Sequence, residues 1–193
     1  MGVKRVWIIE KGNSRWKIGE FNDDVLINVT TADVEAELID SNLPKADSKS
    51  IDILITGSGN WSNDTLELLK SKGNVTQLRH GDSHPLRTNV TNPGSLGTDR
   101  IANAFAIQEG VIDEALTGNA WLIVDVGTCV TFDLVVDGTH LGGAISPGIS
   151  LRLDSMRIGT AALKEVTKDV WNKKAPFKGE TTGLSSEEAQ IKG

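Results

Sequence analysis

The stretch Val6-Trp7-Ile8-Ile9-Glu10-Lys11-Gly12-Asn13-Ser14 has a counterpart later in the chain, Trp121-Leu122-Ile123-Val124-Asp125-Val126-Gly127-Thr128. Each stretch is a short apolar run that ends in an acid, any residue, a glycine and a small polar side chain. Glycine allows positive φ angles and lets backbone N–H groups approach an anion closely, so such a turn suits phosphate. A single strand followed by Asp-x-Gly is ordinary hairpin chemistry. The paired occurrence predicts two similar half-domains that hold one nucleotide between them.

Composition indicates an ordinary globular protein. The 193 residues suffice for one large or two small domains with a real core. The net charge of −6 argues against a general nucleic-acid binder, and no apolar stretch has the length of a signal peptide or a membrane span. The single cysteine, Cys129, excludes a disulfide or a cysteine-cluster zinc site within this sequence. We therefore expect a cytoplasmic protein without a nucleic-acid or membrane partner.

Each acidic turn opens a predicted meander of three short strands. The pattern predicts strands at 5–10, 14–21 and 25–30, and again at 121–125, 128–136 and 140–145. Asp137-Gly138 is a strong hairpin signal between the last two. The repeat places the half-domains at residues 1–112 and 113–193.

Helices and strands are predicted to alternate between and after the meanders. Thr30 with Asp33 resembles a helix cap, which predicts a helix to about Asp40. The remaining predictions are a strand at 51–55, a helix near 63–72, a strand near 74–79, a helix from 97–100 to a C-cap at Gly110, and a helix from Gly148 to about Val166. Residues 80–97 form a long polar loop, and loops of that length are usually functional or mobile.

Asp99 and Arg100 stand at the predicted start of a helix, and two interpretations are open. In the first, Asp99 caps the helix and Arg100 is solvated. In the second, Asp99 accepts a proton from a substrate hydroxyl while the planar guanidinium of Arg100 binds a substrate carboxylate. A carboxylate bound in this way would orient the hydroxyl toward the base.

The remaining conspicuous residues have structural interpretations, with one alternative. The glycine-rich segment 142–148 predicts either a tight strand-to-helix crossover or a backbone surface for adenine or ribose. The histidines show no ligand-like spacing and are interpreted as surface or loop residues: His80, His84 and His140. The tryptophans that flank the acidic turns are interpreted as core: Trp7, Trp16 and Trp121.

Four motifs together resemble the type III pantothenate kinases, over essentially the whole chain and in the family's order. They are Glu10 to Lys17, Gly97-Thr98-Asp99-Arg100, Asp125 to Thr131, and Gly142 to Gly148. The resemblance implies the duplicated actin-like, ribonuclease-H-like α/β fold of the sugar kinase and Hsp70 superfamily. It also implies transfer of the ATP γ-phosphoryl group to the 4′-hydroxyl of pantothenate, the first committed step toward coenzyme A. Members of the family work as homodimers with Mg²⁺ and a monovalent cation, K⁺ or NH₄⁺.

The resemblance also implies residue roles. The first phosphate loop would comprise Glu10, Lys11, Gly12, Asn13, Ser14, Arg15, Trp16 and Lys17, with Asn13, Ser14 and Lys17 facing the nucleotide. Pantothenate would contact Gly97, Thr98, Asp99, Arg100 and Ser186, with Asp99 as the base and Arg100 on the carboxylate. Asp125 would hold the monovalent cation, and Thr128 would contact ATP. Cys129 after the second turn resembles kinases of the Bacteroidetes, which implies a bacterial cytosolic protein.

The sequence departs from the family pattern at four places. Glu10 replaces an aspartate, Lys11 replaces an apolar or neutral residue, and Val90 stands where a substrate-contacting tyrosine is common. Family members also continue for several dozen residues after Ser185-Ser186-Glu187-Glu188, a capping-box pattern that announces a helix. From this we expect a truncated chain with uncovered apolar surface in its second half.

Three functions follow from these observations. The first is a pantothenate kinase, because the motifs provide phosphate loops, a base and a cation site. The second is a non-catalytic or regulatory homologue that keeps the fold, which the departures at Glu10 and Val90 and the short C-terminal tail favour. The third, a different phosphotransferase or hydrolase on this fold, is disfavoured by the Gly-x-Asp-Arg motif.

Overall fold

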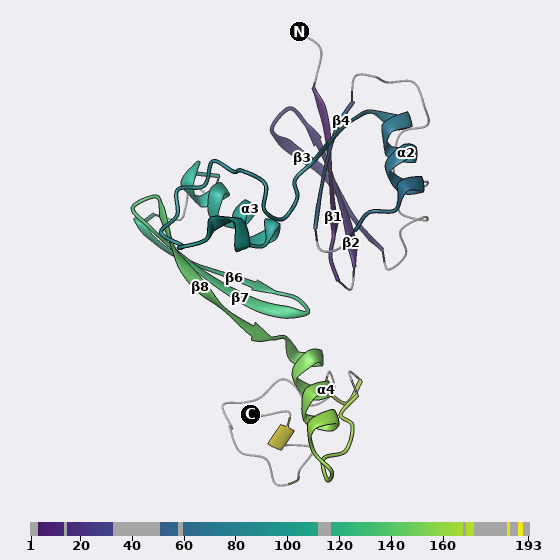
Figure 1. Ribbon diagram of the computed structural model, residues 1–193, viewed down its shortest axis with the longest axis vertical. Coiled ribbons are helices and arrows are strands. Elements are labelled where there is room, and N and C mark those ends of the chain that lie inside the picture. Colours follow the sequence, from purple (N-terminus) through teal and green to yellow (C-terminus); the bar gives the residue numbers. More distant parts are fainter. Residues whose placement is uncertain are drawn as a thin grey trace. The chain divides into compact units, whose positions relative to one another are not determined.

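The computed structural model describes most of the chain outside a few segments. The described residues are 4–13, 15–32, 51–57, 60–111, 117–167, 169–171, 185 and 189–190. Within them, both predicted meanders are present, each as part of its own sheet (Figure 1).

The first meander forms one side of a five-stranded sheet with the order β3-β2-β1-β4-β5. Its strands are β1 (Arg5–Lys11), β2 (Trp16–Asn22), β3 (Val25–Ala32), β4 (Ile51–Gly57) and β5 (Asn74–Gln77). The pairs β1–β2 and β2–β3 are antiparallel, whereas β4 runs parallel to β1 and β5 parallel to β4. Parallel neighbours require a crossover connection, and α2 (Asn63–Lys72) provides it between β4 and β5.

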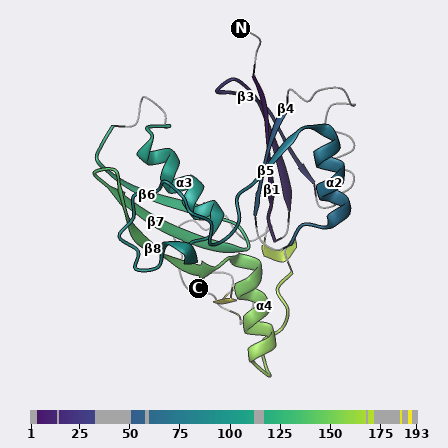
Figure 2. The ribbon, with the colours of Figure 1, turned by 45° about the horizontal axis from the view of Figure 1, so that its top comes forward.

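Alternating apolar residues hold this sheet against its helix. Ile9, Ile53 and Ile55 are fully or almost fully buried at alternate positions of β1 and β4, as expected where one face of a strand is covered. They pack in one cluster with Leu69 of α2. The Oγ of Ser62 caps this helix by accepting from the N–H of Thr65 at 3.1 Å. Figure 2 shows α2 lying along the sheet.

The second meander is a three-stranded sheet of β6 (Ala120–Val126), β7 (Cys129–Val136) and β8 (Thr139–Pro147). Asp137 and Gly138 both have positive φ angles, of 48° and 68°, between β7 and β8. This is the tight hairpin turn that their sequence predicts.

The helix α3 (Thr98–Gln108) covers one face of the second sheet (Figures 1 and 2). Ile101 and Ala104 of the helix pack in one cluster with Val135 of β7, and Trp121 and Ile123 of β6 lie against it. Gly110 follows the helix with a φ of 72°, as predicted for a glycine that terminates a helix. A short 3₁₀ turn, Pro93–Ser95, precedes α3 within the long loop.

The chain divides into two compact units. The first holds residues up to 123 together with 133–142, and the second holds 124–132 together with 143–193. The second unit contains α4 (Ile149–Gly159), whose Leu153 is buried with Val166. The boundary predicted between residues 112 and 113 follows the sequence repeat. It differs from this division, in which the first unit continues to residue 123 and also includes 133–142. No helix of the described residues is long and apolar enough to cross a membrane.

Two predicted helix boundaries are wrong. Thr30 lies inside β3, where it pairs with Ile18 of β2, so it is not a helix cap. α4 ends at Gly159 rather than near Val166, because Thr160 has an extended backbone and its hydroxyl bonds the carbonyl of Met156 at 2.8 Å. Gly and Thr both have low helix propensity. The Thr160 hydroxyl also competes with backbone N–H groups for the helical carbonyl of Met156. The spacing of apolar residues, from which the helix was predicted, contains no information about this competition.

The body of the helix predicted after Thr30 and the helix predicted at the capping box fall wholly or largely outside the described residues. The segment 33–40 lies outside them, as do Ser186, Glu187 and Glu188 of the capping box. Ser185 is described, and its carbonyl accepts from the N–H of Ala189 at 2.8 Å. That four-residue spacing is the one found within a helical turn.

Candidate functional site

The first acidic turn joins β1 to β2 through a tight backbone connection. The N–H of Gly12 donates to the carbonyl of Arg15 at 2.9 Å, and a Cβ on Gly12 would lie only 2.7 Å from that oxygen. Glu10 and Lys11 end β1, Trp16 and Lys17 begin β2, and Asn13 lies exposed in the turn. Ser14, predicted to face the nucleotide, lies outside the described residues.

Glu10 and Lys17 pair across this turn. They are direct neighbours in the β1–β2 register, and Nζ of Lys17 lies 3.1 Å from Oε2 of Glu10. The two side chains remain 33% and 53% exposed, so solvent screens the pair and an anion can compete for the lysine.

Lys11 turns toward the neighbouring loop and an aromatic ring. Its Nζ donates to the carbonyl of Asn60 at 2.7 Å and lies 5.0 Å from the centre of the Trp16 ring. Trp16 in turn packs edge-on against Trp61. A cation above an indole face is a favourable interaction, so Lys11 has structural partners in this conformation.

The second acidic turn lies against the start of α4. Asp125 is half-buried near the end of β6, and Gly127 and Thr128 are exposed in the turn to β7. The N–H of Gly148 donates to the carbonyl of Thr128 at 2.9 Å, and a Cβ on Gly148 would collide with the carbonyl oxygens of Gly127 and Thr128. The first N–H groups of a helix lack intrahelical partners and carry positive partial charge. The turn and the helix start together resemble an anion site.

The Gly-x-Asp-Arg motif forms the first turn of α3. Gly97 is the N-cap residue, Thr98 is buried, and Asp99 is exposed. A Cβ on Gly97 would collide with Oδ1 of Asp99, so glycine at this position makes room for the carboxylate. The result is an accessible acid at a helix N-terminus.

Arg100 is held by Asp133 of β7, a residue outside the four motifs. Nε of Arg100 donates to Oδ2 of Asp133 at 2.9 Å, and Nη2 donates to Oδ1 at 2.6 Å. The side chains are 12% and 2% exposed. The interpretation of Arg100 as a solvated residue is therefore wrong, and its role toward a substrate carboxylate stays a prediction.

This pairing shifts the pKa of both groups. Burial alone would raise the pKa of Asp133, but hydrogen bonds from Arg100 and His140 outweigh it, and the pKa lies below its ordinary value of 3.8. The hydrogen bond to Asp133 also raises the pKa of Arg100, against the effect of its burial. Both groups are therefore charged at neutral pH.

His140 belongs to the same cluster, and its interpretation as a surface or loop residue is wrong. It lies in β8 with no exposed surface, and its Nε2 is 2.7 Å from Oδ1 of Asp133. Asp133 shares a strand face with Val135, two residues along β7, and both are buried. An acid at a core-facing position of an apolar strand was the signal that could have identified this cluster.

The long loop is anchored to β8 beside this cluster. His140 bonds the backbone of this loop on both sides, donating its N–H to the carbonyl of Arg87 at 3.0 Å and accepting from Asn89 at 2.9 Å. Thr88 forms a parallel bridge with His140. Val90 follows directly and lies near Gly142, whose φ is 119°.

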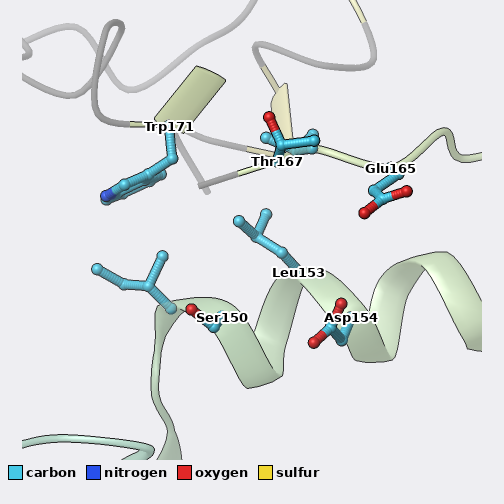
Figure 3. A pocket seen from close by; sticks show the side chains of 8 residues that line it. Ser150, Leu153, Asp154, Glu165, Thr167 and Trp171 are labelled. Atoms are coloured by element: carbon cyan, nitrogen blue, oxygen red, sulfur yellow. The ribbon is translucent and has the colours of Figure 1, made fainter. Parts of the chain in front are cut away.

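The described residues also contain a hollow of about 350 Å³ in the second unit (Figure 3). Its walls come from α4 and the segment that follows it, with Asp154 and Glu165 among its lining residues. Leu153 and Trp171 add apolar surface (Figure 3). Two carboxylates oppose phosphate binding, and none of the four motifs lines this hollow.

The predicted site residues fall into three groups along the chain. The first turn, the second turn with α4, and the start of α3 each have their own geometry, and Ser186 lies outside the described residues. Within the described ranges, no group of three or more His, Cys, Asp or Glu side chains could hold a metal ion.

Comparisons with known proteins point to one family. The family model described as type III pantothenate kinase matches residues 6–187. The type III pantothenate kinase of Flavobacterium psychrophilum is 28% identical over 163 residues, which cover 82% of this chain and 65% of that protein. That of Phocaeicola vulgatus is 31% identical over 62% of this chain and 47% of its own length. The matches thus span less than two thirds of these relatives.

A solved structure shares the fold. The crystal structure of a conserved Baf family transcriptional activator from Campylobacter jejuni has a TM-score of 0.55 and 19% identity. The match covers 96% of this chain and 72% of that one. Together with the family match, the two meanders confirm the predicted actin-like, ribonuclease-H-like α/β fold.

Proposed function

Because this chain belongs to the type III pantothenate kinase family, we propose that it transfers the γ-phosphoryl group of ATP to the 4′-hydroxyl of pantothenate. The observation that carries the proposal is the exposed carboxylate of Asp99 at the start of α3, next to an arginine fixed by a buried acid. This reaction commits pantothenate to coenzyme A.

Asp99 would act as the base. Its carboxylate is accessible at the first turn of a helix, and a positioned general base contributes about 10²–10⁴-fold to a rate. Phosphoryl transfer otherwise depends mainly on positioning and on charge stabilisation. Arg100 would bind the pantothenate carboxylate and thereby direct the hydroxyl at the other end of the substrate toward Asp99.

The two acidic turns would hold the nucleotide. The exposed turn at Gly127 and Thr128, with the start of α4 beside it, supports a phosphate contact. Asn13 and Lys17 in the first turn would add donors, with Lys17 released from Glu10. When bound, Mg²⁺ would neutralise part of the phosphate charge. Mg²⁺ prefers oxygen ligands, and the Glu10 carboxylate could provide one.

Several finer features rest on the family resemblance. Asp125 would bind the monovalent cation, for which a half-buried carboxylate is a suitable oxygen ligand. Ser186 would contact pantothenate. Homodimer formation and a cytoplasmic location complete the proposal.

The test is pantothenate-dependent ADP formation from ATP in Mg²⁺ and K⁺. We expect turnover by the wild-type chain and a loss of about 10²-fold or more in Asp99→Asn, the range of general-base effects. Asp64→Asn is the matched control, because Asp64 is likewise an exposed acid in the first turn of a helix, α2. ATP binding by a folded chain without turnover would overturn the proposal and favour a non-catalytic homologue.

A further inference from the structure

Arg100, Asp133 and His140 form a buried polar cluster that the proposed chemistry does not yet use. The side chains of Asp133 and His140 are 2% and 0% exposed. Oδ1 of Asp133 lies 2.7 Å from Nε2 of His140. Replacing a buried ion pair by apolar residues of similar volume is often neutral for stability. The presence of a charged cluster at this position therefore indicates that the guanidinium of Arg100 must be held in one orientation.

The cluster occupies one defined edge of the guanidinium group. An arginine has five N–H donors, one on Nε and two on each Nη. Asp133 takes the donor on Nε and one on Nη2. Within the described part of the chain Nη1 makes no hydrogen bond, so three donors remain: two on Nη1 and one on Nη2. A planar fork of this kind suits a second carboxylate.

His140 fixes the acid in turn. An ionised carboxylate only accepts hydrogen bonds, so Nε2 of His140 must donate to Oδ1 of Asp133. Nδ1 lies 2.9 Å from the hydroxyl of Thr88, which itself accepts from the N–H of Val90 at 3.1 Å. In the neutral ring, Nδ1 accepts a hydrogen bond from the hydroxyl of Thr88. Every polar atom in this chain of contacts then has a hydrogen-bond partner.

We infer that Asp133 and His140 are positioning residues, which hold the guanidinium of Arg100 so that its Nη1 edge receives the carboxylate of pantothenate. The inference rests on the proposed function. Asp133 sets the plane of the guanidinium, and His140 sets the carboxylate of Asp133. Through Thr88 the same contacts align the loop that carries Val90 with the start of α3.

The experiment compares His140→Leu, His140→Gln and Asp133→Asn with the wild-type enzyme. Substrates are pantothenate and pantothenyl alcohol, in which a hydroxymethyl group replaces the carboxylate. We expect His140→Leu and Asp133→Asn to raise the KM for pantothenate about tenfold or more, the loss of roughly one oriented hydrogen bond to a charged group. The KM for ATP should change less than about twofold.

Two readouts separate positioning from a purely structural role. His140→Gln keeps an amide N–H near the place of Nε2, so it should restore most of the pantothenate KM. For pantothenyl alcohol the variants should match the wild type, because no carboxylate meets Arg100. Asp137→Asn is the control, since Asp137 is an exposed acid of the β7–β8 turn whose side chain bonds Asn119.

Equal losses with both substrates, or an unchanged pantothenate KM, would overturn the inference while leaving the kinase activity established by the wild type. If the wild-type chain lacks pantothenate-dependent turnover, the proposed function and the inference both fail. Should His140→Leu not fold, Thr88→Val removes only the hydroxyl that bonds Nδ1. That variant should raise the pantothenate KM in the same direction by a smaller factor, and an unchanged KM would count against the inference.

Discussion

Glu10 and Lys17 are paired directly across the first turn, with Nζ of the lysine 3.1 Å from Oε2 of the glutamate. The two residues were expected to serve the nucleotide, one as the turn's acid and the other as a phosphate contact. In the observed conformation each satisfies the other. Since both side chains are partly exposed, this contact is weak enough for a triphosphate to displace it.

Glu10→Asp should increase catalytic efficiency with ATP. The shorter side chain withdraws from Lys17 and places the carboxylate where the family has aspartate. Displacement of a group by about 1 Å can cost on the order of 10²-fold in rate, so we expect kcat/KM for ATP to rise by about tenfold. Steady-state kinetics with varied ATP at a fixed pantothenate concentration measures this kcat/KM.

The control for this substitution is Glu67→Asp. Glu67 also pairs with a lysine, Lys70, at 3.0 Å, but on the exposed surface of α2. Its kinetics should match the wild type. An efficiency of Glu10→Asp at or below the wild-type value would show that the longer side chain is adapted to this site.

Asp133→Asn should destabilise the protein in a pH-dependent way. The folded pKa of Asp133 lies below its ordinary value of 3.8, so ionised Asp133 stabilises the folded state above that pH. The contribution decreases as the pH falls from about 4 toward the lowered folded pKa. Removing one partner of a buried pair costs about 3–5 kcal/mol, and the slight exposure of Arg100 favours the lower end, about 3 kcal/mol.

Urea unfolding of wild type and Asp133→Asn at pH 7, 5 and 3 measures this difference. The free energies of unfolding should differ most at pH 7 and 5, and the difference should be smaller at pH 3. Asp137→Asn should show less than about 0.5 kcal/mol at every pH, as surface substitutions usually do. A constant difference between Asp133→Asn and wild type across the range would contradict the pKa direction of Asp133.

Gly148→Ala should weaken ATP binding without unfolding the protein. The new Cβ would collide with the carbonyl oxygens of Gly127 and Thr128, which forces the second turn away from α4. The φ of Gly148 is −68°, a value that alanine adopts freely, so the effect comes from the collision alone. We expect the ATP Kd to rise at least about tenfold, by calorimetric titration, because the phosphate donors are misplaced.

Gly159→Ala in the same helix is the matched control. A Cβ at Gly159 meets no atom within 4 Å, and alanine is a better helix former by about 1 kcal/mol. This variant should bind ATP as the wild type does and unfold at the same or a slightly higher temperature. Equal ATP affinity of the two variants would contradict a phosphate site at the second turn.

The sequence predicted the elements whose signals are local and periodic. Alternating apolar residues in β1 and β4 identified those strands, and Asp137-Gly138 identified a hairpin. The end of α4 was missed because the hydroxyl of Thr160 competes for the last helical carbonyls. Such competition is a property of one residue, and it leaves the apolar periodicity unchanged.

The site was predictable only in part for a different reason. The Asp99 motif is contiguous, so its place at the start of α3 follows from the sequence. The partner of Arg100 is 33 residues away, on a strand whose register with α3 depends on tertiary packing. His140 carried no signal of its own, because a lone histidine in a strand gains a meaning only from the acid beside it.

The outer face of β6 should cause self-association. Leu122, Val124 and Val126 alternate along this strand and are 66%, 48% and 68% exposed, so they form a continuous apolar stripe. Stripes of this kind promote association of soluble proteins. Val124→Thr combined with Val126→Thr keeps the β-branched shape that strands favour and should lower the apparent mass in light scattering at high concentration. Val111→Thr, at an isolated residue that is 72% exposed, should leave that mass unchanged, and an equal decrease in both variants would contradict a role for β6.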